Sequence, residues 1–360
     1  MLIDHLLQEL NEDPQNNRLV LMPLSRLVFD LPFNVGNFYF CSPGDIDLRV
    51  FRPIPNRTLE TQCSEPYGDL FVTTLTGQLL REVSTSLTEF SIDTLNQSHL
   101  VAFVHKADWE SVLLSNHQTD IALLKELSET AEKALDVIRF DYCRLDLPDT
   151  LPGIVGSWRD SGSYLGAMIY TPIDNESYLI AGEAVECSIV IKGIGLEVDG
   201  FTVTELPMIE DGEVSAIASL GLSLLSEAME SPNETMKFIR MMTLFEFLSS
   251  PDDYEKWQDV KKNIVCFKAE TKQQYISLSE RFREFSSKEI DGKQVGYRTL
   301  IVHQGKRLSD VIKKEKERND LFIELQGYAG LILEDMIKHR TELWEDYKDN
   351  RKSMIRKLTS

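Results

Sequence analysis

The sequence contains few of the residues that build metal and redox sites. Five cysteines and six histidines are present among 360 residues. The cysteines are scattered, no pair has the spacing of metal ligands, and an odd count argues against a disulfide framework. This usage is typical of a reducing compartment, so we expect a cytoplasmic protein.

Several signatures of catalysis and membrane insertion are also missing from the sequence. The chain has no Walker A loop, no HExxH, no CxxC pair and no Gly-x-Ser-x-Gly, which argues against the enzyme classes that those motifs mark. No apolar run is long enough to span a bilayer. The acidic N-terminus lacks the basic region of a signal peptide. We therefore expect no membrane partner, and no residues are recognisable as metal ligands.

Positive charge is scarce and unevenly distributed. The 38 Lys and Arg are outnumbered by 58 Asp and Glu, which gives a net charge of −20 and repels nucleic acid at long range. Residues 1–205 hold 13 basic and 31 acidic residues (net −18), and residues 206–360 hold 25 and 27 (net −2). Within 293–318 the balance is eight to three, or +5. This basic segment is either a solvated helix face or an anion-binding surface.

The hydrophobic pattern predicts an α+β chain whose first part, residues 1–205, is a β-rich regulatory or sensor domain with one long helix. Apolar side chains recur at helical spacing over Gln118–Phe140. Short strand-like runs elsewhere are separated by turn residues. The predicted strands are Leu19–Met22, Asn37–Cys41, Asp47–Phe51, Leu70–Thr74, Leu100–His105, Gly166–Tyr170, Ser188–Ile191 and Phe201–Val203.

Residues 206–360 are predicted to form a helical domain. We expect helices over Val214–Met229, from Ser231 to Pro251, over Thr271–Ser287, over Val295–His303, and from Leu308 and Asn319 to about Asp346. Ser231 is the expected N-cap of the second helix, and Gly305 the expected C-cap of the fourth. The last long helix is apolar on more than one face, which predicts burial in the bundle or in a dimer. The basic tail after Lys348 is expected to fray.

Arg298 and His303, in the phrase Tyr297–Gly305 (YRTLIVHQG), are the candidate catalytic residues. Arginine holds phosphate bidentately and keeps its charge, and histidine transfers protons near neutral pH. Together they provide the chemistry for cutting RNA without a metal. The pair alone is weakly specific, since it occurs by chance in about one sequence in four of this composition.

The spacing of this pair raises a geometric question. Five positions along a straight α-helix correspond to about 140° of rotation and about 7.5 Å of rise. Three arrangements remain open: the long Arg298 side chain bends across, the helix is distorted near His303, or a second chain completes the site. We expect the second chain together with a bent Arg298, which predicts an inactive monomer.

The motif and the helices before it resemble the Apea-like group of HEPN domains. Members carry Arg, a spacer of about four to six residues and His, commonly followed by Gly. The segment Phe238–Leu248 (FIRMMTLFEFL) is similar to the aromatic and apolar helix of that family, with an internal Glu. The resemblance covers about residues 212–345. Many catalytic members carry Asn or another strongly polar residue directly after the motif Arg, where this chain has Thr299.

The resemblance implies a dimeric helical bundle with metal-independent endoribonuclease activity and no cofactor. His303 would act as general base or acid, and Arg298 would hold the scissile phosphate. Lys306 and Arg307 would bind flanking phosphates of the RNA substrate. Arg240, Glu246 and Thr299 are candidates for supporting the site, although a structural ion pair is the simpler interpretation of Glu246.

Family members of this kind commonly act as toxins or antiphage defence factors that await a trigger. The acidic residues 1–205 would then restrain RNA access or bind a basic trigger. Two alternatives stay open.

In the first alternative, the helical domain is a non-catalytic dimerisation or binding module that works with a recognition domain. In the second alternative, Asp45 and Asp47 hold magnesium, as the Asp-x-Asp pair of nucleotidyltransferases does. A turn is the simpler interpretation of Ser42–Leu48.

Overall fold

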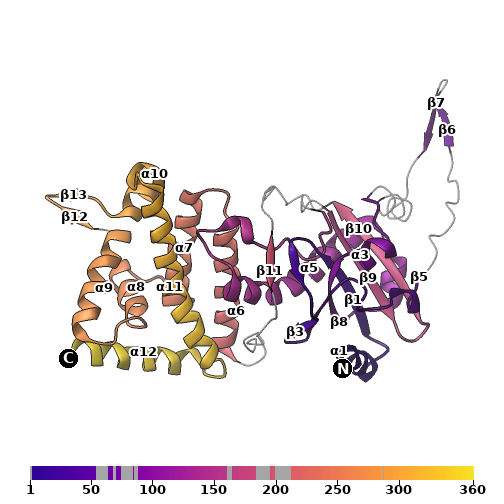
Figure 1. Cartoon of the computed structure of the whole chain (residues 1–360), viewed down its shortest axis with the longest axis horizontal. Coiled ribbons are helices and arrows are strands. Elements are labelled where there is room, and N and C mark those ends of the chain that lie inside the picture. Colours follow the sequence, from indigo (N-terminus) through magenta and orange to yellow (C-terminus); the bar gives the residue numbers. More distant parts are fainter. Residues whose placement is uncertain are drawn as a thin grey trace. The chain divides into compact units, whose positions relative to one another are not determined.

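Figure 1 shows the computed structural model of the chain, which divides into two compact units. The first comprises Met1–Leu135 and Pro152–Thr204, and the second comprises Asp136–Leu151 and Glu205–Ser360. The first unit is built on a β-sheet and the second is helical, so the predicted α+β class is confirmed. The structure describes residues 2–53, 64–67, 70–73, 84, 88–159, 164–183, 195–198, 212–286 and 288–360.

The strands of the first unit are β1 (Asn17–Leu24), β2 (Leu27–Phe29), β3 (Phe33–Val35), β4 (Phe38–Cys41), β5 (Arg52–Pro53), β6 (Ser64–Tyr67), β7 (Leu70–Thr73), β8 (His99–Lys106), β9 (Tyr164–Thr171), β10 (Glu176–Glu183) and β11 (Leu196–Val198). Seven of them form one sheet in the order β3-β4-β8-β1-β9-β10-β5. Neighbours in this sheet are antiparallel except β10 and β5. A parallel β11–β2 pair and a β6–β7 hairpin complete the described strand pairing of this unit.

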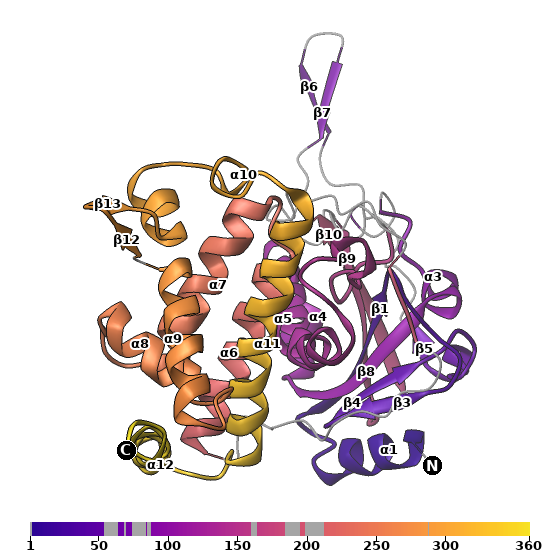
Figure 2. The same ribbon diagram turned by 60° about the vertical axis from the view of Figure 1, so that its left-hand side comes forward.

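Helices pack against this sheet, and Figure 2 shows two of them, α1 and α5, beside it. Leu6 and Leu10 of α1 belong to the same apolar cluster as Leu21 of β1 and Leu100 of β8. On α5, Ile121 packs so closely on β10 that a Cβ at Gly182 would lie 1.9 Å from its Cδ1 atom. Every residue of β1 is buried, as expected of a strand covered on both faces. The helices are α1 (Leu2–Glu12), α3 (Ile92–Gln97), α4 (Trp109–Leu114) and α5 (His117–Tyr142).

Most of the strand and helix predictions for this unit are confirmed, with boundaries shifted by a few residues. The exception is Asp47–Phe51, where the strand prediction is wrong. The chain there forms a 3-10 turn, Leu48–Val50, because the Asp47 side chain accepts from Arg49 N and caps it. Strand β10 was missed, since its first residues read as a turn. The predictions at Ser188–Ile191 and Phe201–Val203 lie outside the described residues.

The second unit consists of helices and one short hairpin. Its helices are α6 (Glu213–Met229), α7 (Glu234–Ser249), α8 (Trp257–Val265), α9 (Lys272–Phe285), α10 (Leu308–Val311), α11 (Glu315–Lys338) and α12 (Trp344–Thr359). Strands β12 (Glu289–Ile290) and β13 (Lys293–Gln294) form the hairpin. Helices α7, α9 and α11 run alongside one another (Figures 1 and 2). In the described parts of the chain, no helix has both the length and the apolar character needed to cross a bilayer.

Four aromatic rings form the centre of the helical core. They lie edge to face with ring centroids 5.5 to 6.5 Å apart. Such pairs contribute about 0.5–1.5 kcal/mol each beyond the burial of their surface. The rings belong to Phe245, Phe282, Phe285 and Tyr328.

The segment Asp136–Leu151 packs with the helices, although it precedes residue 205 in the chain. Gln326 of α11 accepts from Leu145 N at 2.8 Å and donates to Cys143 O at 2.8 Å. The buried Lys237 ammonium of α7 donates to Leu145 O. These bonds make the end of α5 and the loop after it part of the helical unit.

Three predictions about the ends of α-helices are wrong. Helix α11 ends at Lys338 and not near Asp346, which lies in the separate helix α12. The N-cap of α7 is Asn233, whose side chain accepts from Met236 N, and not Ser231. The C-terminal tail does not fray, because residues up to Thr359 form α12. The buried Arg351 of α12 donates to Leu248 O at 3.1 Å and to Ser249 O at 2.6 Å. These contacts satisfy carbonyls at the end of α7 and attach the last helix to the bundle.

Candidate functional site

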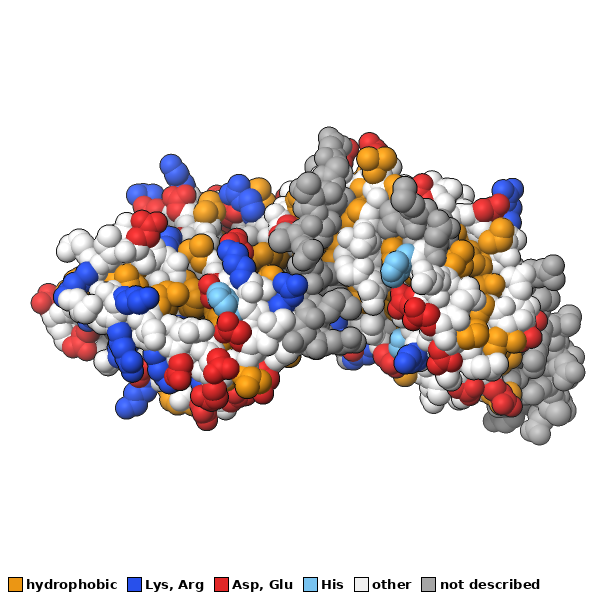
Figure 3. All heavy atoms as spheres, turned by 90° about the horizontal axis from the view of Figure 1, so that it is seen from below, with side chains coloured by type: hydrophobic (Ala, Val, Ile, Leu, Met, Phe, Trp, Pro, Cys, Tyr) orange, Lys and Arg blue, Asp and Glu red, His pale blue; other side chains and the backbone are white. Residues whose placement is uncertain are grey.

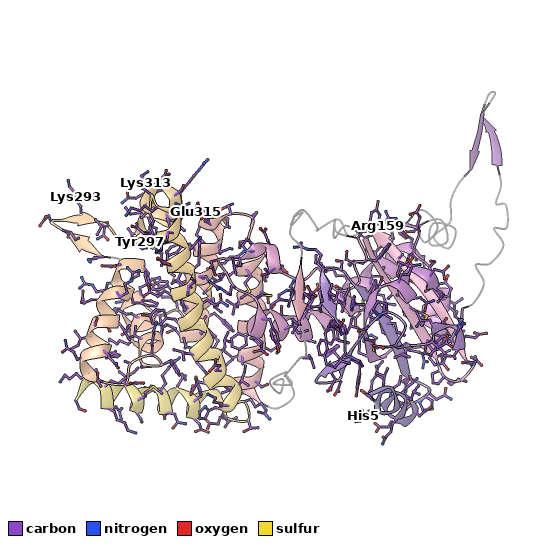
Figure 4. The ribbon with its side chains drawn as sticks, in the orientation of Figure 1. His5, Arg159, Lys293, Tyr297, Lys313 and Glu315 are labelled. Carbon is purple, nitrogen blue, oxygen red and sulfur yellow. The ribbon has the colours of Figure 1, made fainter. Side chains whose placement is uncertain are left out.

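The motif segment begins where the hairpin returns to the end of α9. Figure 4 labels Lys293 on the hairpin and Tyr297 shortly after it. Val295 N and Gly296 N both donate to Lys288 O, at 2.8 and 3.0 Å. A Cβ at Gly296 would lie 2.5 Å from Ser286 O, so only glycine permits this close approach. The backbone is therefore fixed before the motif helix starts.

The motif helix is not the straight α-helix expected from the sequence. It begins at Tyr297 and passes into a π-helical turn over Thr299–His303. Backbone bonds in a π-turn join residues five apart, so positions i and i+5 lie close to one side of the turn. Arg298 and His303 are separated by this interval. The 140° divergence expected of an α-helix therefore does not apply, and the local distortion considered above is the arrangement present.

Arg298 is held by two contacts from neighbouring helices. Its Nη2 donates to Oε1 of Glu246 on α7 at 3.0 Å, and its guanidinium carbon lies 4.9 Å from the ring centroid of Trp257 on α8. The Arg298 side chain is 23% exposed, and that of Glu246 is 32% exposed. The guanidinium is thus oriented but retains access to solvent, as a phosphate-binding arginine requires.

His303 lies on the surface at the end of the π-turn. The C-cap of this turn is Gln304 and not the predicted Gly305, which follows it with φ of +67°. His303, Lys306 and Arg307 are exposed. Leu308 then returns the chain to the bundle, since its N–H donates to Thr235 Oγ1 of α7 at 3.0 Å. The site therefore combines one exposed imidazole, two exposed cations and one oriented arginine.

The remaining candidate residues have contacts of a different kind. Thr299 donates to Ser286 O through both its backbone N–H (3.2 Å) and its Oγ1 (3.1 Å), so it anchors the motif helix to the end of α9. Arg240 donates to Glu227 O at the end of α6 and lies 4.0 Å from the Glu227 carboxylate. None of its described contacts reaches the motif.

The Asp45 and Asp47 carboxylates both take part in local contacts. Asp45 accepts from Ser42 N at 2.7 Å, and Asp47 pairs with Arg49 at 2.7 Å. The hydrogen bonds from Arg49 lower the pKa of Asp47. Over the described ranges, no group of three His, Cys, Asp or Glu side chains is placed to bind a metal ion. The turn interpretation of this segment is the better one.

Trp257 and Ser286 support the motif but were not identified from the sequence. Trp257 contacts Arg298 and also Phe282, whose ring is stacked on it with centroids 6.0 Å apart. Ser286 contributes only its backbone carbonyl to Thr299. A tryptophan at the start of a short helix and a carbonyl acceptor carry no recognisable sequence signal, and both became apparent only from the packing.

The arrangement provides the elements of acid–base chemistry on a phosphodiester. An imidazole that contacts solvent accepts or donates a proton, and an oriented guanidinium stabilises charge on phosphate oxygens. No protein-family model, no curated protein and no solved structure matches this chain.

Proposed function

We propose that the helical unit is a metal-independent endoribonuclease of the HEPN type, with Arg298 and His303 as its catalytic residues. The observation that supports this most directly is the π-turn, because it brings positions 298 and 303 to one side of the helix. The orientation of Arg298 by Glu246 and Trp257 is the second.

In the proposed reaction, His303 removes the proton from a ribose 2′-hydroxyl. The 2′-oxygen attacks the adjacent phosphorus, the P–O5′ bond breaks, and the O5′ atom takes up a proton from a general acid. The products are a 2′,3′-cyclic phosphate and a 5′-hydroxyl. Arg298 stabilises the charge that develops on the phosphate oxygens, and Lys306 and Arg307 bind neighbouring phosphates.

The general acid in this scheme is the partner subunit's His303, which makes the active species a homodimer. Val302, beside His303, is 45% exposed, and an exposed apolar side chain at this place suits a subunit contact. We expect Val302→Asp to be monomeric and inactive. Ile323→Asp, at an equally exposed residue on α11, is the matched control and keeps both properties.

The central test uses wild-type protein, Arg298→Ala and His303→Ala, each incubated with RNA in EDTA. Wild type cleaves, and each substitution lowers the rate by about a hundredfold or more. Mass spectrometry of the fragments should show cyclic phosphate ends. A strict requirement for magnesium would contradict the proposal.

The second candidate function is a non-catalytic binding module. Glu246 favours it, because its carboxylate already pairs with Arg298 and offsets the charge that a phosphate would meet. Absence of cleavage by wild type under every trigger tried, with RNA binding retained, would select this function.

We further propose that the protein acts as a toxin or antiphage effector. In that role, the acidic first unit would restrain RNA cleavage by the helical unit until a trigger arrives. Deleting residues 1–205 would not test it, since Asp136–Leu151 belongs to the helical unit. A suitable chain joins residues 136–151 to 205–360 through a flexible linker. Faster cleavage by this chain than by the full protein supports restraint, and an equal rate refutes it.

A further inference from the structure

A cavity of about 810 Å³ lies between α8, α9 and α12, and its lining includes Trp257 and Ser286, the two residues that support the motif. Its size is that of a small-molecule pocket, which spans about 300–1,000 Å³. Lys261 and Lys262 of α8 and Arg283 of α9 line it, with Glu280 as the acidic lining residue. Figure 3 looks onto the helical unit from the side of α12 and shows Lys and Arg side chains on that face.

Lys261 is the cation of this group whose charge is least compensated. Lys262 pairs with Asp259 at 2.7 Å, and Arg283 pairs with Glu280 at 3.1 Å. The described residues provide no ion pair or hydrogen bond to Lys261. Burial, and then the positive charge of Arg283, lowers the pKa of Lys261, and the nearby Glu280 carboxylate opposes this only in part. An anion in the cavity would offset this repulsion.

Two residues that line the cavity each carry a buried hydrogen-bond donor. Trp257 Nε1 and Ser279 Oγ have no partner among the described atoms. The Trp257 indole contacts the Arg298 guanidinium, 4.9 Å from its ring centroid, and the Phe282 ring, with centroids 6.0 Å apart. Neither contact supplies an acceptor for the indole N–H. Buried donors are nearly always satisfied in folded proteins, so an acceptor is expected at this place.

We propose that this cavity binds a phosphate group, held by Lys261, Lys262 and Arg283 and hydrogen-bonded by Trp257 Nε1–H and Ser279 Oγ–H. Phosphate oxygens match this set, because they accept several hydrogen bonds and carry the opposite charge. The phosphate belongs either to an RNA strand or to a free phosphorylated molecule. The ligand would contact Trp257, which packs against Arg298, and Ser286, which binds Thr299.

The test follows the indole N–H resonances of the full-length protein by ¹⁵N NMR during titration with pyrophosphate. Trp257→Phe keeps the aromatic ring and identifies the Trp257 signal. We expect this signal to shift downfield and saturate, with no such change in sodium chloride of equal ionic strength. Lys261→Met, which keeps the apolar stem, weakens binding by about tenfold or more. Lys316→Met, at an exposed lysine outside the cavity, leaves it unchanged.

A second titration distinguishes the two sources of phosphate. A 2′-O-methyl RNA oligonucleotide, which lacks the nucleophile for cleavage, is added to the pyrophosphate complex. Displacement of pyrophosphate with a continued Trp257 shift identifies an RNA strand as the ligand, and retention of pyrophosphate identifies a free phosphorylated molecule. The proposal is overturned if neither ligand moves the Trp257 signal, or if Lys261→Met and Lys316→Met respond alike. Neither outcome depends on whether the protein cleaves RNA.

Discussion

The Arg298 guanidinium donates a 3.0 Å hydrogen bond to Glu246, although the two residues lie 52 positions apart in the chain. Both side chains retain contact with solvent, at 23% and 32% exposure, so their ion pair contributes only about 0–1 kcal/mol to folding. The larger effect of the ion pair is on the orientation of the Arg298 guanidinium, which Glu246 and Trp257 hold together.

Under the proposed nuclease mechanism, Glu246→Ala is expected to lower the rate of RNA cleavage more than the stability of the fold. The kcat for RNA cleavage should fall by about tenfold, since the guanidinium loses its orientation, while KM changes less. Glu246→Gln keeps an acceptor and should recover part of the rate. Glu324→Ala, which breaks the comparable Arg281 pair at 2.9 Å, is the control. If the kcat of Glu246→Ala equals that of Glu324→Ala, Glu246 does not position Arg298.

Gly296→Ala should destabilise the start of the motif helix. The added Cβ would lie 2.5 Å from Ser286 O and 2.6 Å from Lys288 N, both backbone atoms that cannot rotate away. We expect a loss of about 1–3 kcal/mol in urea denaturation. Gly327→Ala on α11, where the new Cβ would meet no atom within 4 Å beyond its own stretch of helix, should instead stabilise by about 0.5–1 kcal/mol. Equal effects of the two substitutions would contradict the close approach at Gly296.

Arg351→Ala should destabilise the helical unit, because it removes donors to Leu248 O and Ser249 O in a buried position. Carbonyls left without partners cost about 1–3 kcal/mol, which a shift of the urea midpoint would measure. Lys352→Ala is the control. It removes the neighbouring side chain, which pairs with Asp349 at the surface, and should change the urea midpoint little. A small change for Arg351→Ala would show that α12 contributes little to the bundle.

The first unit should lose stability on mild acidification. Burial lowers the pKa of His99 and His105 below the ordinary 6.5, and the Glu126 carboxylate only partly offsets this at His105. The unfolded chain then binds more protons than the folded one below about pH 6.5. The stabilisation is thus present above this pH and is lost as the pH falls toward the folded pKa values.

Urea titrations at about pH 7 and about pH 5 measure this effect. The midpoint of the first unit should fall, and the fall should be smaller in His99→Asn and His105→Gln, which do not titrate. A midpoint that rises on acidification, or an unchanged pH dependence in both variants, would show that the two histidines do not control it.

The elements predicted correctly from the sequence are those whose apolar pattern is set locally. Examples are the strand at Leu19–Met22 and the helix over Gln118–Phe140. The N-cap of α7 was misplaced because Ser231 and Asn233 are both good capping residues, and the choice depends on where the chain enters the bundle. Asp136–Leu151 joins the helical unit through Lys237 and Gln326, which lie far along the chain.

For the candidate site, the sequence identified residue types but not their arrangement. Glu246 was a candidate, and it contacts Arg298. Arg240 was also a candidate, yet its contacts are with Glu227. A helix distortion near His303 was one of three open arrangements, but the sequence did not favour it. The contacts made at the π-turn are the Thr299 bond to the Ser286 carbonyl, the close backbone approach at Gly296 and the burial of Ile301. These are tertiary constraints on a segment whose own pattern is α-helical.

The π-turn has a consequence for how spacer length relates to distance in space. An α-helical winding rotates each added residue by about 100°, so one extra position would normally swing a functional group away from its neighbour. A single widened turn takes up that position and leaves the flanking contacts in register. Two chains with spacers of unequal length can thus present an arginine and a histidine to a substrate in the same arrangement. The number of residues between the arginine and the histidine therefore does not by itself determine the distance between their side chains.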